Sequence, residues 1–311
     1  DAYERYKKLV ETEGVDDASL KEALELFAAA GSADEVFRAY ENLDKAWKAY
    51  LPHAGKAMDV SSVLPDGGRL LPSGTDVMFD NRTHWMTDVD VGNYLVFAID
   101  GSDAQRGDAT GENMIERYCT GNFLAGQRLI YASASGLPVG RYIFKAVAQK
   151  GADGGVIELF ANDDRSPVTS VKVLRETEVA TDVLDQDLTV GVESGLNNAC
   201  QWVSFADVAL EYQSPYMLLE EAVAASDTLT YGEDKGGALK KAADEARVLL
   251  VSGEARERMA AYHTLLDAME QYRLDNASVA HPVDLTVRIQ NAGFDIGNTT
   301  GWTLTVSDAN Y

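Results

Sequence analysis

Aromatic and amide side chains near predicted strand ends and loops are the residues of this sequence best suited to binding chemistry. An aromatic ring stacks on the C–H-rich face of a sugar, while amide, carboxylate or guanidinium groups hydrogen-bond to its hydroxyls. The candidates of this kind are Trp85, Tyr94, Tyr118, Trp202, Asn197 and Asn198. Whether they act together depends on the elements that carry them.

Hard oxygen donors crowd the segment that leads into the first long predicted strand. Calcium is bound by carboxylate and carbonyl oxygens, so one structural calcium ion is a candidate cofactor here, although no twelve-residue EF-hand loop is present. Acidic residues are abundant throughout the chain, and we favour the alternative that these side chains form a solvated surface. The candidate metal ligands are Asp80, Asn81, Asp88 and Asp90, with Asp100 further along.

No catalytic constellation is apparent, which favours a non-enzymatic protein. The four histidines (53, 84, 263 and 281) stand apart, and neither an H-E-x-x-H nor a G-x-S-x-G pattern occurs. Glu112, Glu116 and Glu158 are candidates for a carboxylate pair of the kind that hydrolyses glycosides. With so many acidic residues a chance pair is expected, so this carries little weight.

The charge balance excludes some partners. The 311 residues include 50 Asp and Glu against 27 Lys and Arg, a formal net charge of −23 that is spread over the whole chain. Such a protein repels phosphate backbones and anionic lipid, which makes nucleic acid and a membrane surface poor partners. We favour the simpler interpretation that the charge maintains solubility. No apolar run approaches the ~20 residues that cross a bilayer. Neutral sugars, cations and other proteins remain as partners.

The chain contains two cysteines, Cys119 and Cys200. Two are too few for a disulfide scaffold, and their spacing fits no zinc pattern. Each lies near a predicted strand of the same region. A single disulfide between them and two buried thiols are equally consistent with the sequence.

The elements that must position these residues change character along the chain. Up to about residue 56, apolar side chains recur at spacings of three and four, which predicts helices. From about 57 to 213 the apolar period is two, and Gly, Pro, Asn and Asp clusters separate the runs. Seven short strands with no intervening helix predict an antiparallel sandwich. They span residues 94–99, 123–132, 142–149, 156–161, 168–174, 188–192 and 202–212. In the last, the apolar phase slips at Ala206-Asp207, which indicates a β-bulge.

Helices return between residues 214 and 281, where short loops join three apolar-periodic segments (217–225, 238–250 and 254–272) into an expected bundle. The sequence therefore predicts a multidomain α and β protein, with a β-sandwich flanked by small helical bundles. The expected domains are a partial helical bundle over 1–56, a β-sandwich over 57–213, a three-helix bundle over 214–281, and the start of a second, truncated β-sandwich over 282–311.

Four blocks of sequence recur in the same order, which predicts an internal repeat. The pattern A-Y-x-x-L-x-x-A-x-x-x-Y occurs at 39–50 and again at 261–272. Residues 20–23 match 239–242, and 58–61 match 283–286. Phe79-Asp80 with Trp85 corresponds to Phe294-Asp295 with Trp302. The inferred unit is a pair of helices followed by a sandwich.

Three further motifs carry a family resemblance. The turn G-L-P-x-G-x-Y at 136–142, preceded by Gln127, resembles a hairpin of galactose-binding-like, carbohydrate-binding jelly-roll modules. The segment 291–302 is similar to the opening of such modules. Residues 188–192 followed by 202–210 are similar to their closing strands, except that Ala206-Asp207 replaces the usual Asp-Asn pair.

This resemblance implies a jelly-roll fold, with helical parts that look like FIVAR-like three-helix spacers of secreted surface proteins of gut bacteria. It also implies a structural calcium near the first strand and a core position for Trp85 and Trp202, while Tyr94 and Tyr118 are evenly balanced between core and ligand. The expected setting is extracellular or at the bacterial cell surface. The expected state is a monomeric module of a longer chain.

The functional hypothesis is a non-catalytic protein whose sandwich binds glycans or surface proteins. Two alternatives stay open. One is an accessory region of a larger glycan-active enzyme, and the other is a structural stalk that binds nothing.

Overall fold

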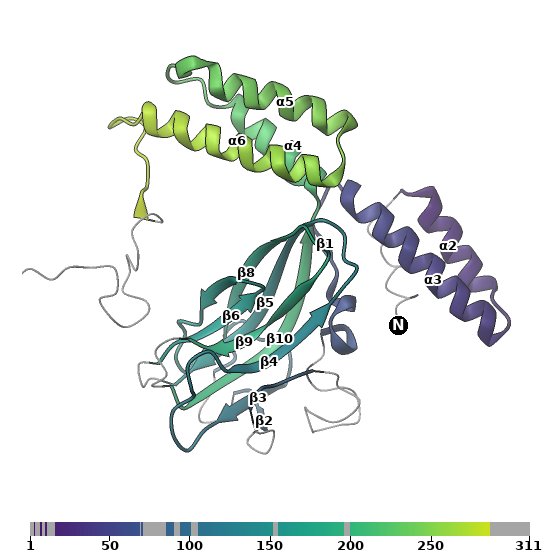
Figure 1. The fold of residues 1–311 in the computed structure, drawn as a ribbon. Helices are drawn as coiled ribbons and strands as arrows, with labels where there is room; N and C mark the ends of the chain where they lie inside the picture. The colour runs from purple at the N-terminus through teal and green to yellow at the C-terminus, as the bar shows by residue number, and fades with distance from the viewer. Residues whose placement is uncertain are drawn as a thin grey trace, which may run out of the picture.

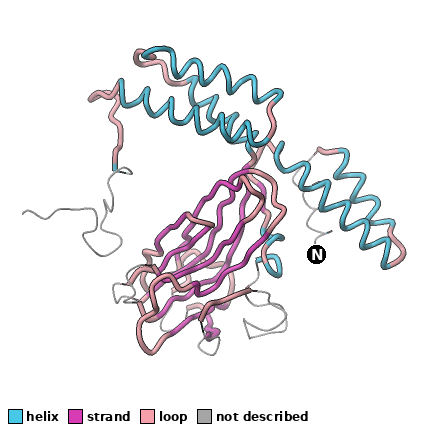
Figure 2. Tube along the Cα trace, viewed as in Figure 1, coloured by secondary structure: helices cyan, strands magenta, loops and turns pink. Residues whose placement is uncertain are grey.

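The computed structural model describes residues 3, 7, 10, 16–68, 70, 85–89, 94–100, 105–151, 155–195 and 200–286 (Figure 1). Its strands form two antiparallel sheets, and its helices lie toward one end of these sheets (Figure 2). The helices are α2 (Ala18–Ala29), α3 (Ala33–Tyr50), α4 (Pro215–Asp227), α5 (Ala238–Ser252) and α6 (Ala255–Asp275). Short 3-10 turns follow α3 (η1, Leu51–His53; η2, Ser61–Val63; η3, Pro65–Gly68) and precede α5 (η5, Lys235–Gly237).

The larger sheet has the strand order β2-β3-β10-β5-β8, with β1 paired to β10, and the smaller sheet has the order β4-β9-β6-β7. All of these strand pairs are antiparallel. The strands of the larger sheet are β1 (Met58–Asp59), β2 (Tyr94–Ala98), β3 (Asn113–Tyr118), β5 (Gly140–Lys150), β8 (Arg175–Val183) and β10 (Trp202–Gln213). Those of the smaller sheet are β4 (Arg128–Ala134), β6 (Ile157–Ala161), β7 (Asp164–Pro167) and β9 (Leu188–Ser194).

The core lies between the two sheets, as the period-two pattern predicts. On β5 the predicted inner residues Tyr142, Phe144, Ala146 and Ala148 are all buried in one hydrophobic cluster. The cluster also includes alternate residues of β10 in the same sheet and of β6 and β9 in the smaller sheet. Alternation of side chains along each strand therefore separates a core face from an outer face in both sheets.

The helices form because their apolar stripes and caps agree. Ser32 caps α3 and forms a capping box with Glu35, and Ala39, Leu43 and Trp47 are buried at intervals of four. Helices α4, α5 and α6 pack around a hydrophobic cluster of their own. By contrast, the buried side chains of α2 and α3 continue into the sandwich cluster.

Polar contacts attach the helices to the sandwich. Arg141 on β5 donates to both carboxylate oxygens of Asp182 on β8 (2.8 and 3.2 Å) and to the Tyr262 hydroxyl of α6 (3.0 Å). Nε2 of His263 lies 2.8 Å from Oδ2 of Asp182. The contacts of Arg141 and Asp182 hold α6 against the end of the larger sheet. Ser214 lies between the last strand and α4. Its hydroxyl accepts a hydrogen bond from the backbone amide of Met217 and donates one to the carbonyl of Ala54.

The turn at 136–142 is built as its residues predict. Gly136 has φ of +65°, a conformation that glycine adopts without strain. The hydroxyls of Tyr142 and Tyr212 donate to the carbonyls of Pro138 (2.9 Å) and Val139 (2.8 Å). Side chains of two neighbouring strands, β5 and β10, therefore hydrogen-bond to the turn.

The predicted strands were partly wrong. Residues 168–174 form no strand and make only single bridges, at Val171 and Val173, because they cross between the two sheets from β7 to β8. The sequence pattern did not identify β1, β3, β7 or β8. In β3 and β8, polar inner residues such as Arg117 and Thr181 weaken the apolar alternation. The sequence pattern also began the strand at 123–132 too early, since β4 starts at Arg128. The bulge is confirmed: the β10 register shifts between Ala206 and Ala209, and Asp207 has φ of +46°.

The internal repeat stays a prediction. Both 39–50 and 261–272 are helical, and in both copies an Asp accepts a hydrogen bond two residues on, from Ser61 to Asp59 (2.9 Å) and from Thr286 to Asp284 (2.8 Å). The environments differ, since Tyr40 is 44% exposed while its counterpart Tyr262 is buried. The recurring blocks around 79 and 294–302 lie outside the described residues, as does most of the expected domain at 282–311.

Among the residues that the structure describes, no helix combines the length and the apolar character needed to cross a membrane.

Gly140 tests the packing of the turn. A methyl group built on Gly140 would lie 2.4 Å from Cε2 of Tyr212, whose ring is fully buried and held by its hydroxyl. We therefore expect Gly140→Ala to lower the free energy of unfolding by about 1–3 kcal/mol through overpacking. Urea denaturation measures the change. Gly55→Ala is the matched control, because nothing lies within 4 Å of its added methyl, and equal losses in the two variants would contradict this account.

Candidate functional site

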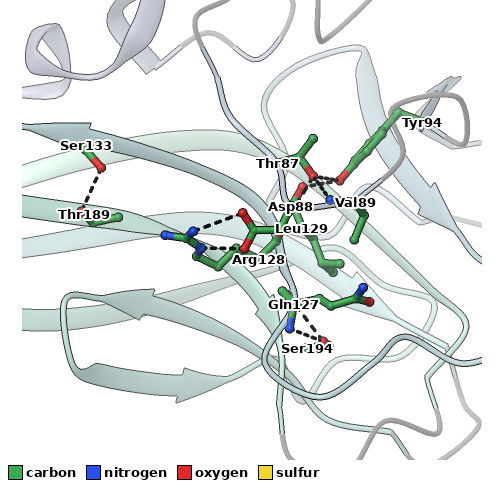
Figure 3. Close-up of polar contacts among 10 residues, drawn as sticks. All are labelled: Thr87, Asp88, Val89, Tyr94, Gln127, Arg128, Leu129, Ser133, Thr189 and Ser194. Atoms are coloured by element: carbon green, nitrogen blue, oxygen red, sulfur yellow. Dashed lines mark hydrogen bonds and ion pairs between the residues drawn. The ribbon is translucent and has the colours of Figure 1, made fainter.

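Trp85 and Tyr94 lie inside the sandwich, so their role in ligand binding stays a prediction. Trp85 is 5% exposed and belongs to the sandwich core. Tyr94 points inward from β2, where its hydroxyl lies 3.1 Å from Oγ1 of Thr87 and donates to the carbonyl of Leu129 (Figure 3). Burial raises the pKa of Tyr94 to about 12. The core position that the resemblance implied for Trp85 is the one observed.

Asp88 is paired with an arginine. Both of its carboxylate oxygens accept hydrogen bonds from Arg128, at 2.8 and 3.1 Å (Figure 3). The hydrogen bond from Arg128 holds the pKa of Asp88 below its usual value. The same guanidinium lies 4.0 Å from the centre of the Tyr131 ring. In the described part of the chain, no group of three or more His, Cys, Asp or Glu side chains is placed to hold a metal ion.

Several predicted site residues lie outside the described residues: Asp80, Asn81, Asp90, Asn197 and Asn198. The calcium site and the amide contribution to ligand binding therefore stay predictions.

Tyr118 and Trp202 are brought together. They are direct cross-strand partners on β3 and β10, so their side chains leave the sheet on the same side, a few ångströms apart. Their sequence neighbours Arg117 and Val203 are buried on the inner side, which places this pair on the outer face. Tyr118 is 42% exposed. The expectation that Trp202 packs in the core is wrong, because Trp202 is half-buried and its parity on β10 is that of the outer face.

Polar side chains form the next row of the same face. Glu116 on β3 faces Ser204 on β10, whose hydroxyl lies 3.4 Å from Oε2 of Glu116, and Ser204 in turn faces Gln149 on β5. Gln149 is fully buried, and its Oε1 accepts no hydrogen bond within the described structure. We call the outer side of the sheet formed by this row and the aromatic pair the Tyr118 face; it comprises Leu95, Glu116, Tyr118, Gln149, Trp202 and Ser204. Gln149 and Ser204 are fully buried, so the exposed part of this face consists of the other four residues.

Apolar side chains and a fixed loop border the Tyr118 face. On the edge strand β2, Leu95 is 49% and Phe97 41% exposed, beside Glu116 and Met114 of β3. On the other side, the segment 105–112 covers a small hydrophobic cluster on the outer face. Asp207 in the bulge of β10 fixes this segment by accepting hydrogen bonds from the backbone of Thr110 (2.5 Å) and Gly111 (3.3 Å).

Of the candidates for a carboxylate pair, Glu116 and Glu158 are not brought together. Glu116 projects from the larger sheet and Glu158 from the smaller one, and their side chains leave opposite surfaces of the sandwich. Glu158 instead lies opposite Glu193, which Arg165 binds. Burial, and then the charge of Glu193, raises the pKa of Glu158.

Cys119 is half-buried and Cys200 is fully buried. Their segments are adjacent, since the amide of Cys119 donates to the carbonyl of Gln201 (2.8 Å). The possible disulfide between them stays a prediction.

The sequence analysis did not identify the polar residues of the Tyr118 face, Glu116, Gln149 and Ser204, as candidates for ligand binding. Ser204 and Gln149 belong to predicted strands, and their even or odd positions relative to the core residues signal the outer face. Glu116 belongs to β3, which the period-two search did not find. The alternation of Met114, Glu116 and Tyr118 with Ile115 and Arg117 is the signal that was available.

Comparison with known proteins finds distant similarity of fold only. No family model matches the chain, and no curated protein matches it. Solved structures that align include the carbohydrate-binding module TmCBM61 in complex with β-1,4-galactotriose (15% identity, 48% of this chain and 93% of that one, TM-score 0.33). The Stig cyclase Fisc from Fischerella sp. TAU aligns at 15% identity over 51% and 99% of the two chains, with TM-score 0.39.

The CBM51-2 and INT domains of Clostridium perfringens ZmpB align at 14% identity over 70% of this chain and 46% of that one, with TM-score 0.24. At these TM-scores, what such proteins bind or catalyse is not transferred to this chain.

The buried hydroxyl of Tyr94 predicts a pH dependence of stability. The folded pKa of about 12 exceeds the ordinary value of about 10 in the unfolded chain. The stability contributed by the neutral phenol is therefore complete below pH ~10 and is lost as pH rises through ~12, by up to about 1.4 kcal/mol per pH unit. Denaturant unfolding of Tyr94→Phe between pH 9 and 12 should show a smaller alkaline loss than wild type. Tyr118→Phe, which changes an exposed tyrosine, should follow wild type, and equal slopes for wild type and Tyr94→Phe would refute the assignment.

Proposed function

We propose that this protein is a non-catalytic binding protein that holds a neutral glycan on the Tyr118 face. The observation that carries this proposal is the cross-strand pairing of Tyr118 with Trp202 on the outer side of the larger sheet. Two adjacent aromatic rings offer a surface on which the C–H-rich faces of sugar rings stack.

A group that reads sugar hydroxyls lies beside the aromatic pair. The Glu116 carboxylate accepts hydrogen bonds from such hydroxyls. The Ser204 hydroxyl is fully buried and lies 3.4 Å from Oε2 of Glu116, where it helps to hold the carboxylate. The two residues face each other across one row of the sheet, next to the aromatic row. An apolar stacking surface flanked by a few polar groups is the usual composition of a small-molecule site. The rigid β3–β10 ladder holds these groups in place without further ordering on binding.

The charge of the protein favours a neutral ligand for this face. With a net charge of −23 and the Glu116 carboxylate at its centre, the Tyr118 face disfavours acidic polymers through like-charge repulsion. Neutral hexose or pentose chains carry no such penalty.

The architecture supports a role at a surface, as part of this proposal. In it, the helical segments serve as spacers between sandwich units, the chain is secreted or displayed on a bacterial cell, and a structural calcium ion stabilises the sandwich. An accessory region of a larger glycan-active enzyme would use the Tyr118 face in the same way. A pure stalk would leave it empty.

A glycan array followed by calorimetry tests the function. The wild-type protein is applied with calcium and, separately, with a chelator, and each neutral oligosaccharide that binds is titrated in solution. We expect Tyr118→Ala and Trp202→Ala each to weaken binding at least tenfold, about 1.4 kcal/mol, because each removes one stacking ring. Tyr118→Phe should weaken it less, since the ring remains.

The matched control is Tyr40→Ala, which removes an equally exposed tyrosine (44%) from α3, away from the sheet. It should bind as wild type does. Absence of binding to every glycan under both conditions would leave only the stalk, and undiminished binding by the Tyr118 and Trp202 variants would place the site elsewhere.

A further inference from the structure

One arginine of the sandwich is buried and forms no ion pair with a carboxylate of the described residues. Arg117 points inward from β3 and is 4% exposed. Its Nη1 donates to the carbonyl of Tyr118, but its Nε donates no hydrogen bond. No carboxylate of the described residues forms an ion pair with it. By contrast, six other basic residues of the sandwich are paired with a carboxylate, at positions 106, 128, 141, 145, 165 and 175.

Two aromatic rings flank this guanidinium. Its central carbon lies 5.2 Å from the Tyr94 ring centre and 5.9 Å from that of Phe123. The hydroxyl of Tyr94 is tied to Thr87 and Leu129, which fixes the ring as a wall (Figure 3). Cation–π contacts offset part of the cost of burying the charge. They supply no hydrogen-bond acceptor for Nε.

The Arg117 guanidinium is hydrogen-bonded at the Tyr118 carbonyl and at the Tyr94 side chain, but its Nε donor is unused within the described structure, and an unused buried donor is costly. A guanidinium carries five N–H donors in a planar fork, and a buried charge is normally paired or it destabilises the fold. Arg117 therefore costs the free protein stability that an apolar side chain of similar length would not cost. A cost of this kind is expected where the charge serves binding.

Arg117 also lies near an end of the sandwich. Its partner on β10 is Val203, the second residue of that strand, and β10 runs from there to α4 at the opposite end (Figure 1). Its partner on β2 is Tyr94, the first residue of that strand. Arg117 thus lies one or two residues from where three paired strands begin or end.

We propose that Arg117 anchors a second binding site, beside the Tyr94 and Phe123 rings. This site binds a small molecule through an anionic oxygen group, which is a carboxylate or a sulfate ester. Carboxylate and sulfate oxygens match the parallel N–H groups of the guanidinium fork and accept two bonds at once. The net charge of −23 repels anions at a distance, but screening limits that repulsion to about 8 Å at physiological salt. Affinity therefore comes from local contacts with Arg117.

This site is separate from the Tyr118 face and does not rest on the glycan-binding proposal. Arg117 and Tyr118 are consecutive on β3, so their side chains leave the sheet on opposite sides.

Thermal unfolding of the full chain with matched sugars tests the proposal. The probes are sodium D-glucuronate, D-glucose 6-sulfate and, as the neutral control, D-glucose, at constant ionic strength. A ligand that binds only the folded protein raises Tm progressively with its concentration. We expect glucuronate, the sulfate ester or both to raise Tm, which distinguishes a carboxylate site from a sulfate site, and glucose to leave Tm unchanged.

Two variants of Arg117 separate binding from folding. Arg117→Met removes the charge at similar length and should unfold at the same or a higher temperature than wild type without ligand, yet show no anion-dependent rise. Arg117→Lys keeps the charge but loses the fork, and should need at least tenfold more anion for the same rise. Tyr118→Ala should respond to anions as wild type does, so failure of the Tyr118 face would be seen separately. The proposal would be overturned if neither anion raised Tm at concentrations up to about 100 mM, or if the anions raised the Tm of Arg117→Met as much as that of wild type.

Discussion

The antiparallel pairing of β5 with β10 is the constraint on which the rest of this structure depends. β10 also pairs with β1 and β3, and β5 pairs with β8, so these two strands join every strand of the larger sheet except β2. Across their ladder the rings of Tyr142 and Tyr212 meet edge to face at 5.0 Å. Both hydroxyls bond the turn before β5, and β10 continues through Ser214 into α4. The position of the helices and of the binding faces thus follows from one strand pair.

β3 shows how a single strand serves two kinds of chemistry. Its outer residues, Glu116 and Tyr118, contribute to an exposed aromatic and polar face, while its inner residues include Ile115 in the core and the buried Arg117. Because side chains alternate across a strand, these two environments are separated by the thickness of the sheet. The bulge at Asp207 adds a third feature, since its carboxylate fixes the loop that borders the outer face.

Much of the fold was predictable because burial leaves a periodic trace. The helical segments, the sandwich class, the inner face of β5 and the bulge at Ala206-Asp207 all follow from apolar spacing. β3 and β8 were missed because their outer residues, such as Glu116 and Glu178, are charged and their inner residues include Arg117 and Thr181, which no hydrophobic pattern identifies. Among the candidate ligand residues, the sequence did not decide whether Tyr118 lies in the core or binds a ligand, and it favoured a core position for Trp202. A tryptophan looks alike in sequence on either side of a sheet.

The sequence by itself determined the local elements, because helix and strand periods, capping residues and turn glycines act over a few neighbouring positions. It also determined the net charge and hence the classes of ligand that the protein repels. Only the tertiary structure decided which residues meet. Tyr118 and Trp202 are 84 positions apart, and it is the register of β3 against β10 that makes them neighbours. The same register places Arg117 among aromatic rings, where no carboxylate of the described residues pairs with it. Strand register depends on the packing of the whole core and cannot be read from any one segment.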